Sequence, residues 1–253
     1  MFTRAIVRKP CKAMLSGLTT ANMGLPDYEL ACEQHQDYIS ALKECGLQVT
    51  ELPALEAYPD SCFVEDVALL TPNCAIITNP GAQSRRGETE HIEDAIQEFY
   101  PQLLRIGSKG HVEAGDIMMV GKHFYIGLSE RTDTHGASQL MDMLALHGMT
   151  GSMVAMSELL HLKTGLSYLE NNNLLTYGEM HTHPDFADFN RIEIDADEDY
   201  AANSVWINGT VLVPKGFPKA LHKIQQLGYK TREVDMSEFQ KLDGGLSCLS
   251  LRF

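Results

Sequence analysis

A cysteine near the carboxyl end of the chain stands in a setting suited to nucleophilic chemistry. Cys248 follows Gly244 and Gly245, and small residues flank it. Paired glycines allow the backbone to approach a ligand closely. The alternative is a buried, inert thiol, which is what most free cysteines are. The other five cysteines lie in stretches that read as helix, strand or turn, so Cys248 is the candidate nucleophile.

A cysteine nucleophile needs a base or a cationic neighbour to activate it. Among the ten histidines the best candidate is His161, which stands between two leucines and shortly before Gly165. The alternative is a histidine buried for structural reasons in an apolar segment. Five others lie on or beside predicted helices, and we expect them to face water. These are His35, His91, His135, His147 and His222.

Carboxylates gather around an apolar run. Asp60, Glu65 and Asp66 surround a strand that we predict over Phe63–Leu70, where Glu65 and Asp66 point to opposite faces. Glu113 repeats the theme further along the chain. A buried, unpaired carboxylate is costly, so acids on core strands indicate a cation to pair with. The alternative is structural pairing with an arginine of the protein or with a helix N-terminus.

Arginines occupy two loops that we expect to be equivalent. Arg85 and Arg86 lie in the loop 81–87, and Arg131 lies in the loop 129–132. Arginine suits a carboxylate because its planar fork bonds both oxygens. The alternative is plain surface charge. Acids, arginines and cysteine together describe one ligand with a cationic head, a carboxylate and an electrophilic carbon. Free arginine and its N-substituted derivatives fit.

A repeating unit of two strands, a helix and a strand must position these groups. Turn residues join the paired strands, as at Asn208-Gly209, and the hairpins recur at roughly 40–50 residues. One predicted helix covers Glu88–Phe99. About five such units fill the chain, which favours a closed ring, an α/β fold in a single domain over residues 1–253. The competing fold is an open doubly wound sheet, although no G-x-G-x-x-G follows the first strand.

Composition narrows the classes of partner. The net charge of −14 argues against nucleic acid and anionic membranes. No apolar run is long enough to cross a bilayer, and the N-terminus lacks the features of a signal peptide, so we expect a cytoplasmic protein. The cysteines form no C-x-x-C pair, which indicates reduced thiols and no zinc site. His181 and His183 form an H-x-H pair, which we interpret as part of a polar loop rather than a metal site.

The chain resembles the bacterial dimethylarginine dimethylaminohydrolases of the pentein, or guanidine-modifying, superfamily. The stretches that carry the resemblance run from residue 16 to the last residue. They are SGLTTANMGLPDY, YPDSCFVED, NPGAQSRRGETE, VEAGDIMMVGKHFYIG, LHLKTGLSYLENNNLL and KLDGGLSCLSLRF. The resemblance implies a five-bladed, pseudo-symmetric α/β-propeller. It also implies hydrolysis of Nω-methylated L-arginine to L-citrulline and methylamine or dimethylamine, with no metal or organic cofactor.

The resemblance also implies a role for each matching residue. Cys248 would be the nucleophile, His161 the general acid and base, and Glu113 the acid that orients His161. The substrate contacts would be Asp66 with Glu65 at the guanidinium, Arg85 and Arg131 at the α-carboxylate, and Asp60 with the backbone carbonyls of Leu18 and Leu242 at the α-amino group. We expect a small-molecule substrate, and any self-association should give a symmetric homodimer.

Two other functions use parts of the same residue set. An arginine or agmatine deiminase would share the cysteine chemistry, but the deiminases of arginine are longer and carry a helical insertion for which this chain has no room. A non-catalytic protein that binds cationic amino acids would need only the acids and arginines. The combination of Cys248, His161 and Glu113 favours an enzyme over such a binder.

Overall fold

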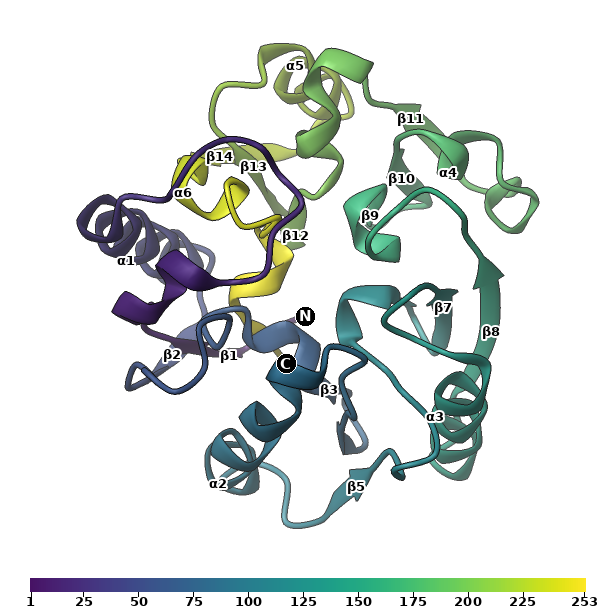
Figure 1. Cartoon of the computed structure of the whole chain (residues 1–253). Helices are drawn as coiled ribbons and strands as arrows, with labels where there is room; N and C mark the ends of the chain where they lie inside the picture. Colours follow the sequence, from purple (N-terminus) through teal and green to yellow (C-terminus); the bar gives the residue numbers. More distant parts are fainter. The chain divides into compact units, whose positions relative to one another are not determined.

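Five small mixed sheets form the β-structure, and all share one topology (Figure 1). The computed structural model describes residues 1–253. In each sheet the central strand pairs antiparallel with one neighbour and parallel with the other. A helix lies in sequence between the central strand and its parallel partner. This is the predicted repeating unit. The alternative of one open sheet is wrong, because the strands form five separate three-stranded sheets.

Two compact units divide the chain, and the first comprises residues 1–64 and 165–253. Its sheets are β15 (Leu251–Arg252), β1 (Arg4–Arg8) and β2 (Gln48–Leu52); β9 (Leu166–Tyr168), β10 (Asn173–Thr176) and β11 (Asn190–Glu193); and β12 (Val205–Ile207), β13 (Thr210–Pro214) and β14 (Lys230–Val234). Its helices are α1 (Tyr28–Glu44), α4 (Glu179–Thr182), α5 (Pro218–Gln226) and α6 (Ser237–Gln240). Because β15 pairs with β1, the two chain ends share one sheet.

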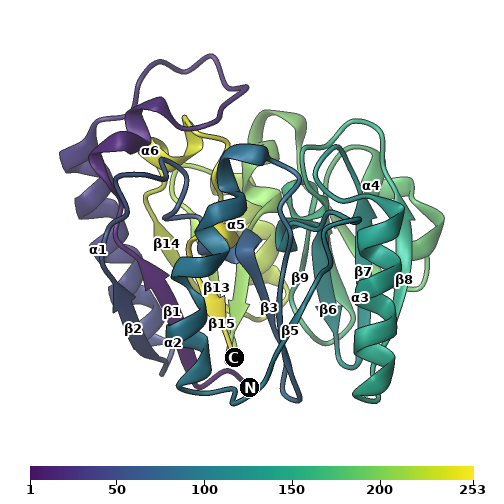
Figure 2. The same ribbon diagram turned by 60° about the horizontal axis from the view of Figure 1, so that its bottom comes forward.

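The second unit comprises residues 65–164. Its sheets are β3 (Ala68–Leu70), β4 (Ala75–Ile77) and β5 (Leu103–Arg105), and β6 (Ile117–Val120), β7 (His123–Leu128) and β8 (Thr150–Ala155). Its helices are α2 (Glu93–Gln97) and α3 (Thr134–Leu146). Figure 2 shows α3 running beside β7 and β8. Phe124 of β7 and Leu140 and Leu144 of α3 pack in one apolar core. That the whole chain forms one catalytic domain stays a prediction.

Local sequence explains how several elements begin and turn. Asp27 caps α1 by accepting hydrogen bonds from the backbone N–H groups of Glu29 and Leu30. Asn208 and Gly209 both have positive φ, 51° and 93°, which is the backbone of a tight hairpin turn between β12 and β13. The hairpin predicted at Asn208-Gly209 is therefore confirmed.

Three local predictions are wrong. In the predicted strand Phe63–Leu70 only Ala68–Leu70 is extended, because Val64–Val67 forms a 3₁₀ turn in which the carboxylate and the carbonyl of Asp66 accept hydrogen bonds from Gly115 and Thr78. The predicted helix Glu88–Phe99 shortens to α2, after a 3₁₀ segment at Gln83–His91. His35 does not face water: its side chain is fully buried on the inner face of α1.

Candidate active site

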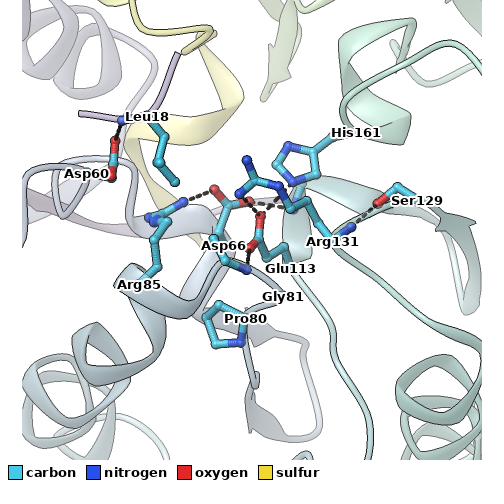
Figure 3. A network of polar contacts seen from close by, with 12 residues as sticks. Leu18, Asp60, Asp66, Pro80, Gly81, Arg85, Glu113, Ser129, Arg131 and His161 are labelled. Atoms are coloured by element: carbon cyan, nitrogen blue, oxygen red, sulfur yellow. Dashed lines mark hydrogen bonds and ion pairs between the residues drawn. The ribbon is translucent and has the colours of Figure 1, made fainter. Parts of the chain in front are cut away.

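Asp66 is the anchor of a buried polar network in the second unit (Figure 3). Asp66 lies on the 3₁₀ turn Val64–Val67, and its carboxylate accepts a backbone hydrogen bond. The N–H of Gly115 donates to Oδ1 at 2.9 Å, and Thr78 Oγ1 donates to the Asp66 carbonyl at 2.7 Å. The guanidinium of Arg85 donates to Oδ2. Glu65 is buried too, so both acids lie inside rather than on opposite faces of a strand.

Arg85 is held by two carboxylates at once. Its Nη1 bonds Asp66, while Nε and Nη2 bond the two oxygens of Glu88 at 3.1 and 2.8 Å. Burial lowers the pKa of Arg85, but the charges of Glu88 and Asp66 outweigh it and raise that pKa well above its usual value. Arg85 is therefore a permanent buried cation, and the surface-charge alternative is wrong for it.

Glu113 and His161 form the second half of the network. Glu113 Oε2 lies 2.8 Å from His161 Nε2, and the Ala82 N–H donates to Oε1 at 2.9 Å. Burial raises the pKa of Glu113, yet the hydrogen bond and charge of His161 outweigh it and lower that pKa. Burial lowers the pKa of His161, but the charges of the surrounding carboxylates outweigh it and raise that pKa above its usual value. The pair is thus a carboxylate and an imidazolium at neutral pH.

Arg131 completes the cationic side of the network. Its Nη1 lies 3.5 Å from Glu113 Oε2, and about a fifth of its side chain (21%) is exposed. Ser129 Oγ accepts the backbone N–H of Arg131 at 3.0 Å, which fixes the loop predicted at 129–132. Arg131 therefore faces the acids, as the equivalent-loop prediction requires, while Arg86 of the other loop is exposed.

Three charged residues of this network were missing from the sequence-based set. Lys163 Nζ lies 2.6 Å from Glu65 Oε1, and Glu88 holds Arg85. Asp116 is fully buried and accepts the Leu162 N–H at 2.9 Å. Two of them had a signal in their spacing, because Glu88 follows Arg85 by three residues and Asp116 follows Glu113 by three, whereas Lys163 had none. On a tight turn, residues three apart lie on one side.

Cys248 belongs to the first unit, where tight backbone contacts fix its loop. The Gly245 N–H donates to Cys248 Sγ at 3.4 Å, and Cys248 is half-buried. Asn203 bonds Ser247 twice, accepting its N–H at 2.9 Å and donating to its Oγ at 3.1 Å. A Cβ on Gly245 would approach the Asn203 side chain within 2.5 Å, so only glycine fits there. The alternative of a fully buried, inert cysteine does not hold for Cys248, because the residue is only partly buried.

Asp60, Leu18 and Leu242 also lie in the first unit. Asp60 is buried, and its Oδ1 accepts the Leu18 N–H at 2.9 Å. A Cβ on Gly17 would come within 2.8 Å of the same oxygen. Leu242 is buried, and Leu18 is exposed. The structure thus ties Asp60 to the backbone of Leu18, and the substrate contacts predicted for these three residues stay predictions.

Asp66, Glu113 and His161 offer donor atoms within 4.8 Å of one another, which is the spacing of a metal site. Those groups already bond one another or Arg85. A guanidinium beside Asp66 opposes a second cation at the same place, so we assign no metal to this cluster.

No helix of the chain has the length and apolar character needed to cross a membrane.

Comparison with known proteins places these groups in context. The family described as "N,N dimethylarginine dimethylhydrolase, eukaryotic" matches residues 26–173. An N(G),N(G)-dimethylarginine dimethylaminohydrolase of Pseudomonas aeruginosa is 55% identical over the full length of both chains. An enzyme of the same name from Streptomyces coelicolor is 32% identical, covering 98% of this chain and 96% of the relative.

Solved structures agree over the whole chain. A cysteine-to-serine mutant of the P. aeruginosa protein, complexed with citrulline, superposes with a TM-score of 0.99, covering all of both chains. The N-terminal domain of ArgZ, an arginine dihydrolase, shares the fold at 19% identity, with a TM-score of 0.88 over 100% of this chain and 97% of that one. The predicted five-bladed α/β-propeller of the penteins is therefore confirmed as the fold class.

Proposed function

The chain belongs to the dimethylarginine dimethylaminohydrolase family, and we propose that it hydrolyses Nω-methylated L-arginine, mono- or asymmetric dimethyl, to L-citrulline and methylamine or dimethylamine. It is an enzyme that acts on C–N bonds of linear amidines. The observation that carries the proposal is the buried network of acids around His161, which suits a guanidinium. The comparisons support it as well, because the chain is 55% identical, over the full length of both chains, to an enzyme of that name. The cysteine-to-serine mutant of that enzyme was solved with citrulline.

The charge of the network favours a cationic ligand. When Asp116 is ionised, five carboxylates face three cationic side chains and His161, so one negative charge remains even when His161 is protonated. The acids are Glu65, Asp66, Glu88, Glu113 and Asp116, and the permanent cations are Arg85, Arg131 and Lys163. A buried negative charge is costly, so the acids of the network favour the guanidinium end of the ligand, while Arg85 and Arg131 balance its carboxylate.

The proposed reaction divides one difficult step into two. Cys248 Sγ attacks the guanidinium carbon as a thiolate, and the resulting tetrahedral adduct loses the amine, which His161 protonates. His161 then takes a proton from water, and the hydroxide attacks the thiouronium carbon to release citrulline and the free thiolate. Asp66 stabilises positive charge on the substrate throughout, which keeps the carbon electrophilic. Glu113 holds the imidazole by the 2.8 Å hydrogen bond.

We assign the α-carboxylate to Arg85 and Arg131. To bind it, Arg85 must release its Nη1 from Asp66, while Glu88 continues to hold Nε and Nη2. The substrate guanidinium then replaces the Arg85 group on Asp66, so the acid is never left unpaired. We assign the α-amino group to Asp60 and the carbonyls of Leu18 and Leu242.

A homodimer, a cytoplasmic location, and the lack of nucleic-acid and membrane partners stay predictions.

Citrulline release by the purified protein tests the function. We expect turnover of Nω-methylarginine and asymmetric dimethylarginine, little turnover of arginine or agmatine, and no turnover by Cys248→Ser. Preference for arginine or agmatine would assign the protein to a deiminase activity instead. Tight binding without turnover on all four compounds would leave only a binding protein, and normal turnover by Cys248→Ser would refute the cysteine mechanism.

A further inference from the structure

Asp116 is a fully buried carboxylate to which the proposed reaction gives no role. It ends the 3₁₀ turn Ala114–Asp116, which begins directly after Glu113. Its side chain bonds the turn that follows His161. An ionised group at this depth is expensive to bury, so its partners indicate why it is there.

Three donors surround the Asp116 carboxylate. Oδ1 accepts the Leu162 N–H at 2.9 Å, and Oδ2 accepts the Ser129 hydroxyl at 2.7 Å. The Thr132 hydroxyl is the third donor and the second from a side chain. Ser129 Oγ already accepts the N–H groups of Arg131 and Thr132, so its own proton is donated to Asp116, and the Leu162 N–H can only donate. This set of donors suits an anion. Burial raises the pKa of Asp116 above its ordinary value, and the charge of His161 and these hydrogen bonds oppose that effect only in part.

The charged groups around His161 differ in how they are neutralised. Asp66 bonds Arg85, and Glu113 lies beside Arg131 as well as His161. Lys163, on the same turn as His161, pairs with Glu65. Asp116 forms no ion pair with an arginine or a lysine, and the one charge that acts on it strongly is that of His161. A protonated His161 is therefore the natural counter-charge of Asp116.

We propose that Asp116 is a positioning residue for His161: it fixes the peptide that follows His161 through the Leu162 N–H, and its carboxylate supplies a counter-charge to the imidazolium. This inference rests on the proposed function, because a general acid must hold its proton until the amine departs. The same carboxylate also ties the turn of Arg131 to that of His161, since Ser129 Oγ donates to Asp116 and accepts the Arg131 N–H. The turns that carry His161 and Arg131 are therefore both held by one buried carboxylate, that of Asp116.

The test compares Asp116→Asn with Ser129→Ala. Asparagine keeps an acceptor for the Leu162 N–H but removes the charge, whereas Ser129→Ala removes the three hydrogen bonds of the hydroxyl and keeps the charge. We expect the His161 resonance of Asp116→Asn to titrate about one pH unit lower than in the unsubstituted chain. The basic limb of the kcat profile should move with it, and kcat should fall about tenfold while KM stays within about twofold. Ser129→Ala should leave the His161 titration in place.

Equal His161 titrations in Asp116→Asn and the unsubstituted chain would overturn the proposal. If Asp116→Asn does not fold, the carboxyl carbon resonance of Asp116 in the unsubstituted chain decides the matter. The proposal requires an ionised carboxylate at pH 7 that senses the titration of His161, and a protonated carboxyl at pH 7 contradicts it. Both NMR measurements are independent of turnover. Loss of methylarginine hydrolysis in the unsubstituted chain, with the titration shift intact, would therefore overturn the proposed function alone.

Discussion

Lys163 Nζ lies 2.6 Å from Glu65 Oε1, and both side chains are largely buried. Sequence reasoning grouped Glu65 with Asp66 as a substrate anchor. In the structure Glu65 is paired within the protein, as the alternative of structural pairing allows, although the partner is a lysine rather than an arginine. That Glu65 contacts the substrate guanidinium beside Asp66 stays a prediction.

Removing the lysine should destabilise the fold. Lys163→Met leaves the buried Glu65 charge without its cation, and we expect the free energy of unfolding to fall by about 3 kcal/mol in urea titrations. Glu65→Gln combined with Lys163→Met should recover much of that loss, because no uncompensated charge remains. Strictly additive effects of the two substitutions would show that the ion pair has no energetic coupling.

Removing the Asp66 carboxylate should act mainly on binding. Asp66→Ala leaves Arg85 paired with Glu88 but removes the group that would receive the substrate guanidinium. We expect KM for methylarginine to rise at least about tenfold, a loss of one charged hydrogen bond. Steady-state kinetics measure this, and Glu90→Ala, an exposed acid on the neighbouring 3₁₀ segment, serves as the control. A fall in kcat at unchanged KM would instead place Asp66 in the chemical step.

Gly115 has no room for a side chain. A Cβ there would come within 2.8 Å of both Asp66 Oδ1 and His161 Nδ1. Gly115→Ala must therefore push the two groups out of place, and we expect citrulline formation to fall about a hundredfold or more. Gly121→Ala is the matched control: its φ of +60° strains an alanine by about 1 kcal/mol, but nothing lies within 4 Å of the new Cβ. Equal activity of the two variants would contradict the crowding argument.

Asn203 should position the Cys248 loop. Asn203→Ala leaves the buried Ser247 N–H without its acceptor, which should lower the free energy of unfolding by about 2 kcal/mol. The loop then loosens, and we expect the rate of Cys248 alkylation by iodoacetamide, followed by mass spectrometry, to change along with kcat. Asn203→Asp keeps the acceptor for the N–H and should restore the alkylation rate in part. An alkylation rate in Asn203→Ala identical to that of the unsubstituted chain would separate Asn203 from the nucleophile.

The repeating unit could be predicted from sequence because its signals are local. Alternating apolar runs, turn residues such as Asn208-Gly209 and the glycines after helices act within one strand or helix. The 3₁₀ turn at Val64–Val67 could not be predicted from sequence. Its stabilising hydrogen bond comes from Gly115, which is distant in the chain. The pairing of Glu65 with Lys163 was missed for the same reason. His35 was misassigned because a helix position next to polar residues looks exposed until α6 is placed against it.

Burial of His35 should make the free energy of unfolding depend on pH. The side chain is fully buried on α1, its ring lies 6.3 Å from that of Phe239, and neither ring nitrogen has a hydrogen-bond partner. Burial is the main reason that the pKa of His35 is lowered to about 4. The unfolded chain takes up a proton near pH 6.5, whereas the folded protein resists protonation until about pH 4.

The unfolding free energy should therefore fall as pH decreases from about 6.5 to about 4, with His35 contributing about 3 kcal/mol of that loss. His35→Phe removes the titrating group and the two unpaired nitrogens while filling similar space beside Phe239. Urea unfolding across this pH range should give a difference between His35→Phe and the unsubstituted chain that grows steadily toward acid. His135→Phe, at an exposed position of α3, should give no such slope. A flat difference for His35→Phe would mean that the folded protein accepts a proton on His35 as readily as the unfolded chain does.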